Sequence, residues 1–376
     1  MIRSVTVFGT RPEAIKMMPL VKHLAHDVRY QNTTCVTGQH EEMLEQVMTL
    51  FDFSADINLR IMQESNSLVD IYSKAMSKLV SVFEDLQPDI IFVHGDTASA
   101  FSAAMAAYLT KTKVAHVEAG LRTHDLFSPW PEEGNRKLIS SLAELHFSPT
   151  NIAMKNLLSE GVKRHQIYTT GNTVIDALHY ISKKVSNNRE FKKKFHSDYP
   201  QIDFAKKIIL VTGHRRENFG KGFDDICHAL EKIANCEKNI QIIYPVHMNP
   251  NVKEVVLKKL GNIENILLLE PMSYDKFVYL LSNCHLVVTD SGGIQEEAPG
   301  LGKPVVLMRD TTERPEALSA GTVRLTGTDP AQIVSTVGLL LNSDAEYELM
   351  SKAVNPFGDG TASKKIANSC YEYLTR

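Results

Sequence analysis

The sequence predicts an α/β protein with two doubly wound parallel-sheet domains. Two observations predict this fold class. Short runs rich in β-branched residues alternate with amphipathic stretches, and the alternation stops near the middle of the chain and then restarts. Runs that are apolar on both faces are typical of buried parallel strands, and strand–helix repetition builds such sheets. A length of 376 residues is compatible with two domains.

The first half contains six predicted strands, separated by amphipathic stretches such as 67–86. They are SVTVFGT (4–10), TTCVTGQ (33–39), DIIFVHGD (89–96), KVAHVEAG (113–120), HFSPT (146–150) and IYTTG (167–171). Residues 182–207 are basic and polar, and we interpret them as helix ends and a linker. This change of composition places the domain boundary near residues 172–200.

The second half repeats the pattern, and a helical candidate follows each strand. The strands are KIILVTGH (207–214), IQIIYPVH (240–247), NILLLE (265–270), HLVVTDSG (285–292), PVVLMRD (304–310) and TVRLTG (322–327). We therefore expect Rossmann-like domains at 1–172 and 173–359, with a cleft between them. The C-terminal helix, 360–376, is expected to join the first domain. In such folds the ligand crevice lies at the carboxyl ends of the strands.

The composition limits the classes of function that the protein can have. The chain is 43% hydrophobic and 23% charged, with a formal net charge of −3, which gives no support to nucleic-acid binding. No apolar run approaches the roughly 18 residues that a membrane helix needs. The N-terminus does not resemble a signal peptide. The five cysteines are widely spaced and odd in number, which indicates reduced thiols in a cytoplasmic protein.

The first predicted strand ends in GTRPEAIK, where a helix begins at Pro12. Arg11 and Lys16 stand on the first turns of that helix. Positive side chains there oppose the helix dipole, so they are better explained by a bound anion. The alternative is a solvated basic face.

Two further strands of the first half end in carboxylates. DIIFVHGD ends at Asp96, which is equally suited to capping the next helix and to catalysis. KVAHVEAG ends near Glu118, whose pKa burial would raise unless a cation pairs with it. Arg122 is a nearby candidate for that cation. PEEGNR then places Glu132 and Glu133 in the first turn of a helix, where acids are favoured on structural grounds alone.

Polar residues follow the strands of the second half too. His214 and Arg215 follow one strand, and His247 follows the next. Ser291, Gly292 and Gly293 lie between a strand and a helix, so their N–H groups can cradle phosphate oxygens. Glu296 and Glu297 come one turn later, where an acid can accept hydrogen bonds from a ribose diol. Arg314 is another phosphate candidate.

The sequence lacks several cofactor motifs. There is no HExxH, no Walker A motif and no GxGxxG after the first strand. These absences disfavour NAD chemistry and ATP hydrolysis. No set of carboxylates forms an obvious divalent-metal cage, although Asp96 and Asp125 are candidates.

Long motifs in this order resemble the bacterial non-hydrolysing UDP-N-acetylglucosamine 2-epimerases, over about residues 3–360. They are GTRPEAIK, HGDT, HVEAGLRT, SPWPEEGNR, GNTVIDAL, TGHRREN, PVHMNPNV, TDSGGIQEEAP and GKPVVLMRDTTERPEA. The resemblance implies a glycosyltransferase-B type fold, a homodimer, and no metal or cofactor. It also implies reversible conversion of UDP-GlcNAc to UDP-ManNAc for surface polysaccharide precursors.

Carried over residue by residue, the resemblance implies the following roles. The catalytic residues are Asp96, Glu118, Glu132 and His214. The substrate-binding residues are Arg11, Lys16, Met272, Phe277, Ser291, Gly292, Gly293, Glu297 and Arg314, with Phe277 beside uracil and Met272 replacing a frequent Gln. A second, regulatory UDP-GlcNAc site matches Gln39, His40, Arg215 and His247. Glu41, Glu42 and the segment QESNSL depart from the regulated members, so regulation is a weaker expectation than catalysis.

The implied chemistry explains these residue types. C2 of the sugar is not adjacent to a carbonyl, so its proton becomes acidic only when the C1–O bond to UDP breaks. The leaving UDP needs cations and N–H dipoles, and protonation from two faces needs two acid/base groups with different pKa values. Which carboxylate is the base stays open. A glycosyltransferase of the same fold, a hydrolysing 2-epimerase and a non-catalytic sugar-nucleotide sensor are the alternatives.

Overall fold

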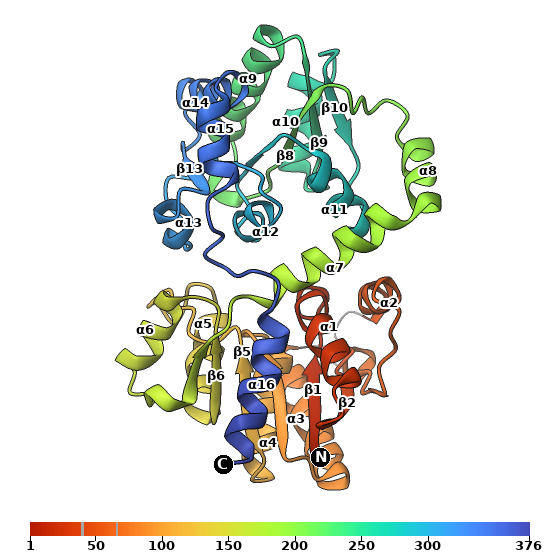
Figure 1. Ribbon diagram of the computed structural model, residues 1–376, viewed down its shortest axis with the longest axis vertical. Helices are drawn as coiled ribbons and strands as arrows, with labels where there is room; N and C mark the ends of the chain where they lie inside the picture. The colour runs from red at the N-terminus through yellow and green to blue at the C-terminus, as the bar shows by residue number, and fades with distance from the viewer. Residues whose placement is uncertain (39–40, 65–66) are drawn as a thin grey trace. The chain divides into compact units, whose positions relative to one another are not determined.

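A computed structural model describes residues 1–38, 41–64 and 67–376 (Figure 1). Its contacts divide the chain into two compact units. Unit 1 comprises Met1–Ala177 and Phe357–Arg376, and unit 2 comprises Leu178–Pro356. The contact boundary lies inside a helix, a few residues beyond the predicted residue 172.

Unit 1 contains a seven-stranded parallel sheet in the order β3-β2-β1-β4-β5-β6-β7. The strands are β1 (Ile2–Phe8), β2 (Tyr30–Val36), β3 (Ile57–Asn58), β4 (Ile90–His94), β5 (Lys113–Val117), β6 (Leu145–Ser148) and β7 (Ile167–Thr169). The helices are α1 (Arg11–His26), α2 (Glu41–Leu50), η1 (Ile61–Glu64), α3 (Leu68–Leu86), α4 (Ala98–Leu109), α5 (Glu132–Leu142), α6 (Asn151–Ser159), η2 (Arg164–Gln166) and α16 (Ala362–Leu374). Helix α7 (Thr173–Asn187) begins in unit 1 and ends in unit 2.

Unit 2 contains a six-stranded parallel sheet in the order β10-β9-β8-β11-β12-β13. The strands are β8 (Lys207–Thr212), β9 (Ile240–Pro245), β10 (Ile266–Leu269), β11 (Leu286–Thr289), β12 (Val305–Leu307) and β13 (Val323–Leu325). The helices are α8 (Arg189–Asp198), η3 (Arg216–Asn218), α9 (Lys221–Cys236), α10 (Pro250–Leu260), α11 (Tyr274–Asn283), α12 (Ile294–Gly300), α13 (Pro315–Ser319), α14 (Pro330–Asn342) and α15 (Asp344–Ser351).

All twelve predicted strands are present, because each has an apolar run that both faces of a covered sheet can bury. Most predicted strands extended two or three residues too far at the carboxyl end. Those extra residues form the loops that carry the polar groups. The sequence did not predict β3, whose two residues are too few to show periodicity.

The basic stretch at 182–207 is largely helical, not a linker with helix ends. It holds the end of α7 and the whole of α8. Phe191 and Phe195 lie one turn apart on α8 and pack edge-on against Tyr279 of α11, at centroid distances of 5.7 and 4.7 Å. These aromatic contacts stabilise a helix that its lysine content obscured in the sequence.

The C-terminal segment packs within unit 1. Figure 1 shows α16, in blue, among the red to yellow elements, and it contacts α1. The Tyr30 hydroxyl donates to the Ala367 carbonyl at 2.6 Å. Across both units the five cysteines are free thiols. Among the described residues, no helix is both long and apolar enough to span a bilayer.

Candidate functional site

In unit 1 the strand order changes direction between β1 and β4, which pair in parallel. The loops that follow these two strands therefore leave the sheet side by side at its carboxyl edge. In open α/β sheets this topological switch point is where ligands bind. The first loop leads to Arg11, which is half-buried at the start of α1, and the second contains Asp96.

Glu13 ties these two loops together. Its buried carboxylate accepts the backbone N–H groups of Gly9 and Thr10 at 3.0 and 2.8 Å, and the Thr97 hydroxyl at 2.6 Å. Burial raises the pKa of Glu13, and these hydrogen bonds oppose the rise. Gly9 is also sterically required, since a Cβ there would lie 2.0 Å from Ser99 Oγ. The buried Glu13 and the tight packing at Gly9 thus fix the geometry of the loops after β1 and β4.

Glu118 follows β5 in the left-handed region, with φ of 61°, which is uncommon for a residue other than glycine. Its side chain is only 9% exposed and its Oε2 is surrounded by three groups. The Lys16 ammonium lies at 2.5 Å, the Asn172 amide donates at 2.7 Å, and His94 Nε2 lies at 3.7 Å. Backbone strain and converging donors of this kind are typical of functional sites.

Opposing effects set the ionisation of Glu118. Burial alone would raise its pKa, but Lys16, His94 and the hydrogen bonds from Lys16 and Asn172 outweigh it and hold the pKa well below the ordinary value. Burial lowers the pKa of His94 to about 4, against the attraction of Glu118, so His94 is neutral at neutral pH. The positive charge that keeps Glu118 ionised there is therefore Lys16.

The suggestion that Arg122 pairs with Glu118 is wrong. The Arg122 guanidinium lies 2.6 Å from Glu160 and also donates to Ser140. The left-handed turn at Glu118 directs the two side chains to different neighbours, an effect that sequence proximity does not show.

Asp96 is not the helix cap. Thr97 caps α4, accepting the Ala100 N–H at 3.1 Å, which leaves the Asp96 carboxylate for Arg136 at 2.7 Å. Asn135 donates to the Asp96 carbonyl at 2.7 Å and fixes the backbone. Burial raises the pKa of Asp96; Arg136 opposes this and the Glu118 charge adds to it. The pKa values of Asp96 and Glu118 thus shift in opposite directions.

The two glutamates of α5 differ in role. Glu133 is fully buried and accepts the N–H groups of Thr123 and His124 at 3.1 and 3.2 Å, and Arg136 at 3.1 Å. It therefore anchors the loop before α5. Glu132 is half-buried in the first turn of α5, and no such anchoring bond is described for it. The same loop exposes Trp130, which is 62% accessible, so this tryptophan is not a core residue.

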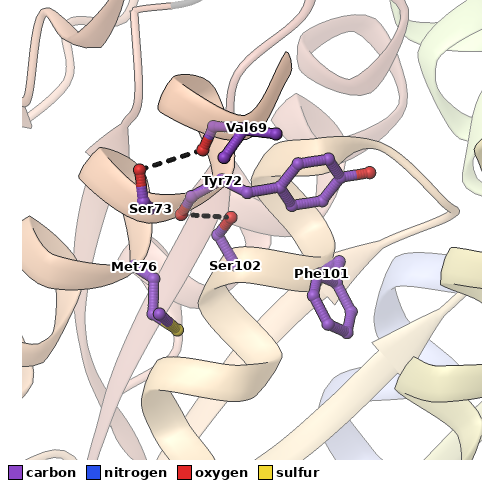
Figure 2. Close-up of a pocket in the computed structure, with 6 residues that line it drawn as sticks. All are labelled: Val69, Tyr72, Ser73, Met76, Phe101 and Ser102. Atoms are coloured by element: carbon purple, nitrogen blue, oxygen red, sulfur yellow. Dashed lines mark hydrogen bonds between the residues drawn. The ribbon is translucent and has the colours of Figure 1, made fainter. Parts of the chain in front are cut away.

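Tyr72 of α3 supports Asp96 indirectly, through Asn135. The Tyr72 hydroxyl donates to Asn135 at 3.0 Å, and burial raises the Tyr72 pKa, with Glu132 and Asp96 adding to the rise. Figure 2 shows Tyr72 beside an apolar hollow between α3 and α4, lined by Val69, Tyr72, Ser73, Met76, Phe101 and Ser102. The hollow contains no charged side chain and is not the candidate site.

Unit 2 has its own switch point, between β8 and β11. Asp290, at the end of β11, is fully buried and accepts the backbone N–H groups of His214 and Arg215 at 3.0 and 2.9 Å. Asn218 donates to the same carboxylate at 3.2 Å. This buried acid therefore fixes the loop after β8 beside the turn that opens α12.

Two guanidinium groups flank that turn. A Cβ at Gly292 would lie 2.7 Å from Arg314 Nη1 and 3.4 Å from Arg215 Nη2. The Ser291 N–H donates to Thr289 Oγ1 at 2.9 Å, whereas the N–H groups of Gly292 and Gly293 have no acceptor among the described residues. Cations and free N–H groups around one turn form an anion-binding site. Arg215, predicted for a regulatory site, lies at this turn.

The carboxylates of α12 have separate partners. Glu296 pairs with Arg314 at 2.5 Å. Glu297 accepts the Tyr274 hydroxyl at 2.7 Å through Oε1, and its Oε2 lies near Gly293. Tyr274 opens α11, whose first turns also carry the half-buried Phe277; Met272 lies just before the helix. These residues place an apolar ring and a fixed carboxylate on adjoining elements of unit 2.

The imidazole rings of His214 and His247 stack, with centroids 5.4 Å apart and an interplanar angle of 22°. Burial lowers the pKa of His214, and His247 and Arg215 lower it further against the effect of Asp290. His247 Nδ1 accepts the Asn249 N–H at 3.1 Å. Two regulatory candidates thus adjoin His214 and the Gly292 turn. The other two, Gln39 and His40, lie outside the described residues.

Sequence patterns missed the residues that orient the candidates. They are Glu13, Asn135, Arg136, Asn172, Tyr274 and Asp290. Each acts through a partner distant in sequence, up to 84 residues for Glu13. Within the described parts of the chain, no group of three or more His, Cys, Asp or Glu side chains could hold a metal ion.

Comparisons with known proteins agree on one family. The sequence model described as UDP-N-acetylglucosamine 2-epimerase matches residues 22–370. A curated UDP-N-acetylglucosamine 2-epimerase of Escherichia coli K12 is 52% identical over 365 residues, covering 97% of each chain. The Neisseria meningitidis UDP-GlcNAc 2-epimerase bound to UDP-GlcNAc has a TM-score of 0.88 and 45% identity, covering 99% of this chain and 100% of that one.

A solved structure with lower sequence identity is also a UDP-GlcNAc 2-epimerase. The Methanocaldococcus jannaschii UDP-GlcNAc 2-epimerase in complex with UDP-GlcNAc and UDP has a TM-score of 0.77 and 31% identity, covering 98% of this chain and 99% of that one.

Proposed function

The chain belongs to the UDP-N-acetylglucosamine 2-epimerase family and is an epimerase, and from that premise we propose its reaction. It converts UDP-GlcNAc reversibly to UDP-ManNAc by inverting C2, without metal or cofactor, for surface polysaccharide precursors. Relatives with UDP-GlcNAc and UDP bound support these ligands. A homodimer and a cytoplasmic location are part of the same proposal.

The observation that carries the proposal is the pair Asp96 and Glu118. Both lie at the carboxyl edge of the unit 1 sheet, and the pKa of Asp96 is raised while that of Glu118 is lowered. Inversion at C2 needs one group to take a proton and another to return one on the opposite face. Two carboxyls whose surroundings separate their pKa values suit these roles. Glu132 is the third candidate.

The proposed chemistry is an elimination followed by a re-addition. The C1–O bond breaks and its electron pair leaves with UDP, so C1 gains oxocarbenium character. A carboxylate then takes the C2 proton, and its C–H electrons form the C1–C2 double bond of 2-acetamidoglucal. A carboxyl returns a proton to the other face of C2, and a phosphate oxygen of UDP adds to C1. No redox partner is required.

We assign leaving-group stabilisation to the cationic side chains. In unit 2, Arg314, His214 and the N–H groups of Gly292 and Gly293 hold the diphosphate, and Arg215 flanks the same turn. We assign the same role to Arg11 and Lys16 of unit 1. Fixed donors aimed at developing negative charge are worth about 3–4 kcal/mol each. Glu297 binds the ribose, and Phe277 and Met272 bind the uracil.

The test is turnover of UDP-GlcNAc followed by proton NMR. The manno product should accumulate to a fixed ratio from either direction, with the rate unchanged after exhaustive chelation. Free ManNAc would indicate a hydrolysing enzyme, and turnover only with an added acceptor would indicate a glycosyltransferase. UDP binding without any conversion would leave a sensor and exclude the epimerase reaction.

A further inference from the structure

The chain leaves unit 1 after Ala177 and returns to it at Phe357. Asn172 and Phe357, near these two crossings, are hydrogen-bonded, because the Asn172 N–H donates to the Phe357 carbonyl at 2.7 Å. The two crossings are therefore joined by a backbone bond inside unit 1.

Two glycines bring the segments at 171–172 and 357–358 into contact. Gly171 and Gly358 both have positive φ, of 88° and 125°. A Cβ on Gly171 would lie 3.1 Å from the Phe357 carbonyl oxygen and from Gly358 Cα, and one on Gly358 would lie 3.3 Å from Gly171 Cα. Neither position has room for a side chain without a shift, so the close approach is built into the sequence.

The side chain of Asn172 extends from this junction to Glu118. It is buried, at 2% exposure. Its Oδ1 accepts the Val174 N–H at 3.1 Å, which defines the amide orientation, so Nδ2 is the atom that faces Glu118 Oε2 at 2.7 Å. One residue thus bonds the returning chain through its backbone and the candidate catalytic carboxylate through its side chain.

We propose that Asn172 is a positioning residue that couples the paired chain crossings to the orientation and basicity of Glu118. This inference rests on the proposed function, which makes Glu118 an acid/base group. Any rearrangement of the backbone at the crossings displaces the Asn172 amide and changes the donors on the carboxylate. In enzymes whose domains close over substrate, closure completes the catalytic site, so a link at the chain crossings ties Glu118 to the segments that would move.

The surroundings of Glu118 define what the link controls. Lys16 from α1, His94 from β4 and Asp96 after β4 are the titratable groups that act on it, and Asn172 is the neutral donor. Lys16 supplies charge, and His94 is neutral with an Nε2 that makes no hydrogen bond among the described residues. Loss of the Asn172 donor removes a bond to the ionised form of Glu118, which raises the carboxyl pKa.

The experiment compares Asn172→Asp with Asn156→Asp in the full-length protein. Asn172→Asp keeps the acceptor for the Val174 N–H and the side-chain size, but replaces the amide donor to Glu118 with a second carboxyl, so the lost bond and the added acid both raise the Glu118 pKa. Asn156 lies on α6 of the same unit and donates to the Gly120 carbonyl at 3.0 Å. Asn156→Asp is therefore the control, because the same substitution removes an amide donor that bonds the backbone and not Glu118. The readouts are kcat and KM against pH, and the Kd for UDP.

We expect Asn172→Asp to lower kcat on the order of 100-fold, as misplacement of a catalytic group does. The acidic limb of its kcat/KM profile moves to higher pH, while the Kd for UDP changes far less than kcat, because Asn172 is not among the proposed UDP ligands. Asn156→Asp leaves the profile in place. If Asn172→Asp does not fold, by circular dichroism, Asn172→Ser takes its place with the same expectation.

Wild-type kinetics in Asn172→Asp, or a lower rate with an unshifted pH profile, would overturn the coupling and leave Asn172 a structural residue. Absence of turnover in the wild-type protein would instead overturn the proposed function, so the two failures are distinguishable.

Discussion

The Lys16 ammonium lies 2.5 Å from the Glu118 carboxylate, across 102 residues of sequence, within the described part of unit 1. The pair joins the first turns of α1 to the end of β5. Lys16 is a proposed diphosphate ligand and Glu118 a proposed acid/base group, so the same cation holds the carboxylate ionised before substrate arrives. An incoming anion that shares Lys16 would weaken its hold and make Glu118 a stronger base.

Replacement of Lys16 by Met should reverse the pH dependence of the contribution that Glu118 makes to the free energy of unfolding. In the wild-type protein the folded pKa of Glu118 lies below the ordinary value of 4.5, so its stabilisation is present above that pH and is lost as the pH falls. In Lys16→Met, burial raises the pKa instead. The variant should lose about 3 kcal/mol of unfolding free energy at neutral pH, and the deficit should shrink on acidification.

Urea denaturation followed by the fluorescence of Trp130, the single tryptophan, reports on unit 1. Lys22→Met on the same helix is the control, since Lys22 donates to the Phe51 carbonyl. A deficit that is equal at all pH values, or matched by Lys22→Met, would contradict the assignment of the Glu118 pKa to Lys16.

The isosteric variants Asp96→Asn, Glu118→Gln and Glu132→Gln should each lower kcat by about 100-fold or more, because removal of a general acid or base costs that much. Glu84→Gln, at an exposed position on α3, is the control and should keep the wild-type rate. Initial rates with saturating UDP-GlcNAc provide the measurement. Near-full activity in all three folded variants would remove the carboxylates from the mechanism.

Tyr274→Phe should weaken ribose recognition. The Tyr274 hydroxyl donates to Glu297 Oε1 at 2.7 Å, so its loss removes one donor from the carboxylate that we propose for the ribose diol. Titration calorimetry with UDP should show about 10-fold weaker binding, the scale of one hydrogen bond to a charged group. With 2′-deoxy-UDP the penalty should be smaller. An equal penalty for both nucleotides would show that Tyr274 does not act through the ribose.

Gly9→Ala should destabilise unit 1, because the added Cβ would lie 2.0 Å from Ser99 Oγ and 2.1 Å from Thr37 Oγ1. We expect a loss of about 1–3 kcal/mol, as for other overpacked cores. Gly134→Ala is the matched control, since nothing lies within 4 Å of a Cβ there and Gly134 is helical. It should be neutral or stabilising by up to about 1 kcal/mol. Equal melting temperatures for the two variants would contradict the steric argument.

The fold and the positions of most candidate residues followed from the sequence, for a physical reason. Both sheets are parallel, so apolar runs identify the strands, and the residues after each run must lie at one edge. Asp96, Glu118 and Ser291 were placed in this way. Their roles came from the family resemblance.

What the sequence did not predict was the pairing. Arg122 is four residues from Glu118 and pairs elsewhere, whereas Lys16 is distant in sequence and makes the contact. Asn172 and Tyr274 are neutral and carry no motif signal of their own. Their roles depend on which strand ends meet, and a single sequence contains that information only through the completed topology.

Incubation of UDP-GlcNAc with the protein in deuterated water, followed by proton NMR, tests the central claim most directly. Our account predicts that deuterium enters C2 as UDP-ManNAc forms, since the proton removed is replaced from the solvent, and that Asp96→Asn and Glu118→Gln suppress the exchange. UDP-GlcNAc that stays unlabelled and unconverted, or a manno product that keeps its original C2 proton, would contradict it.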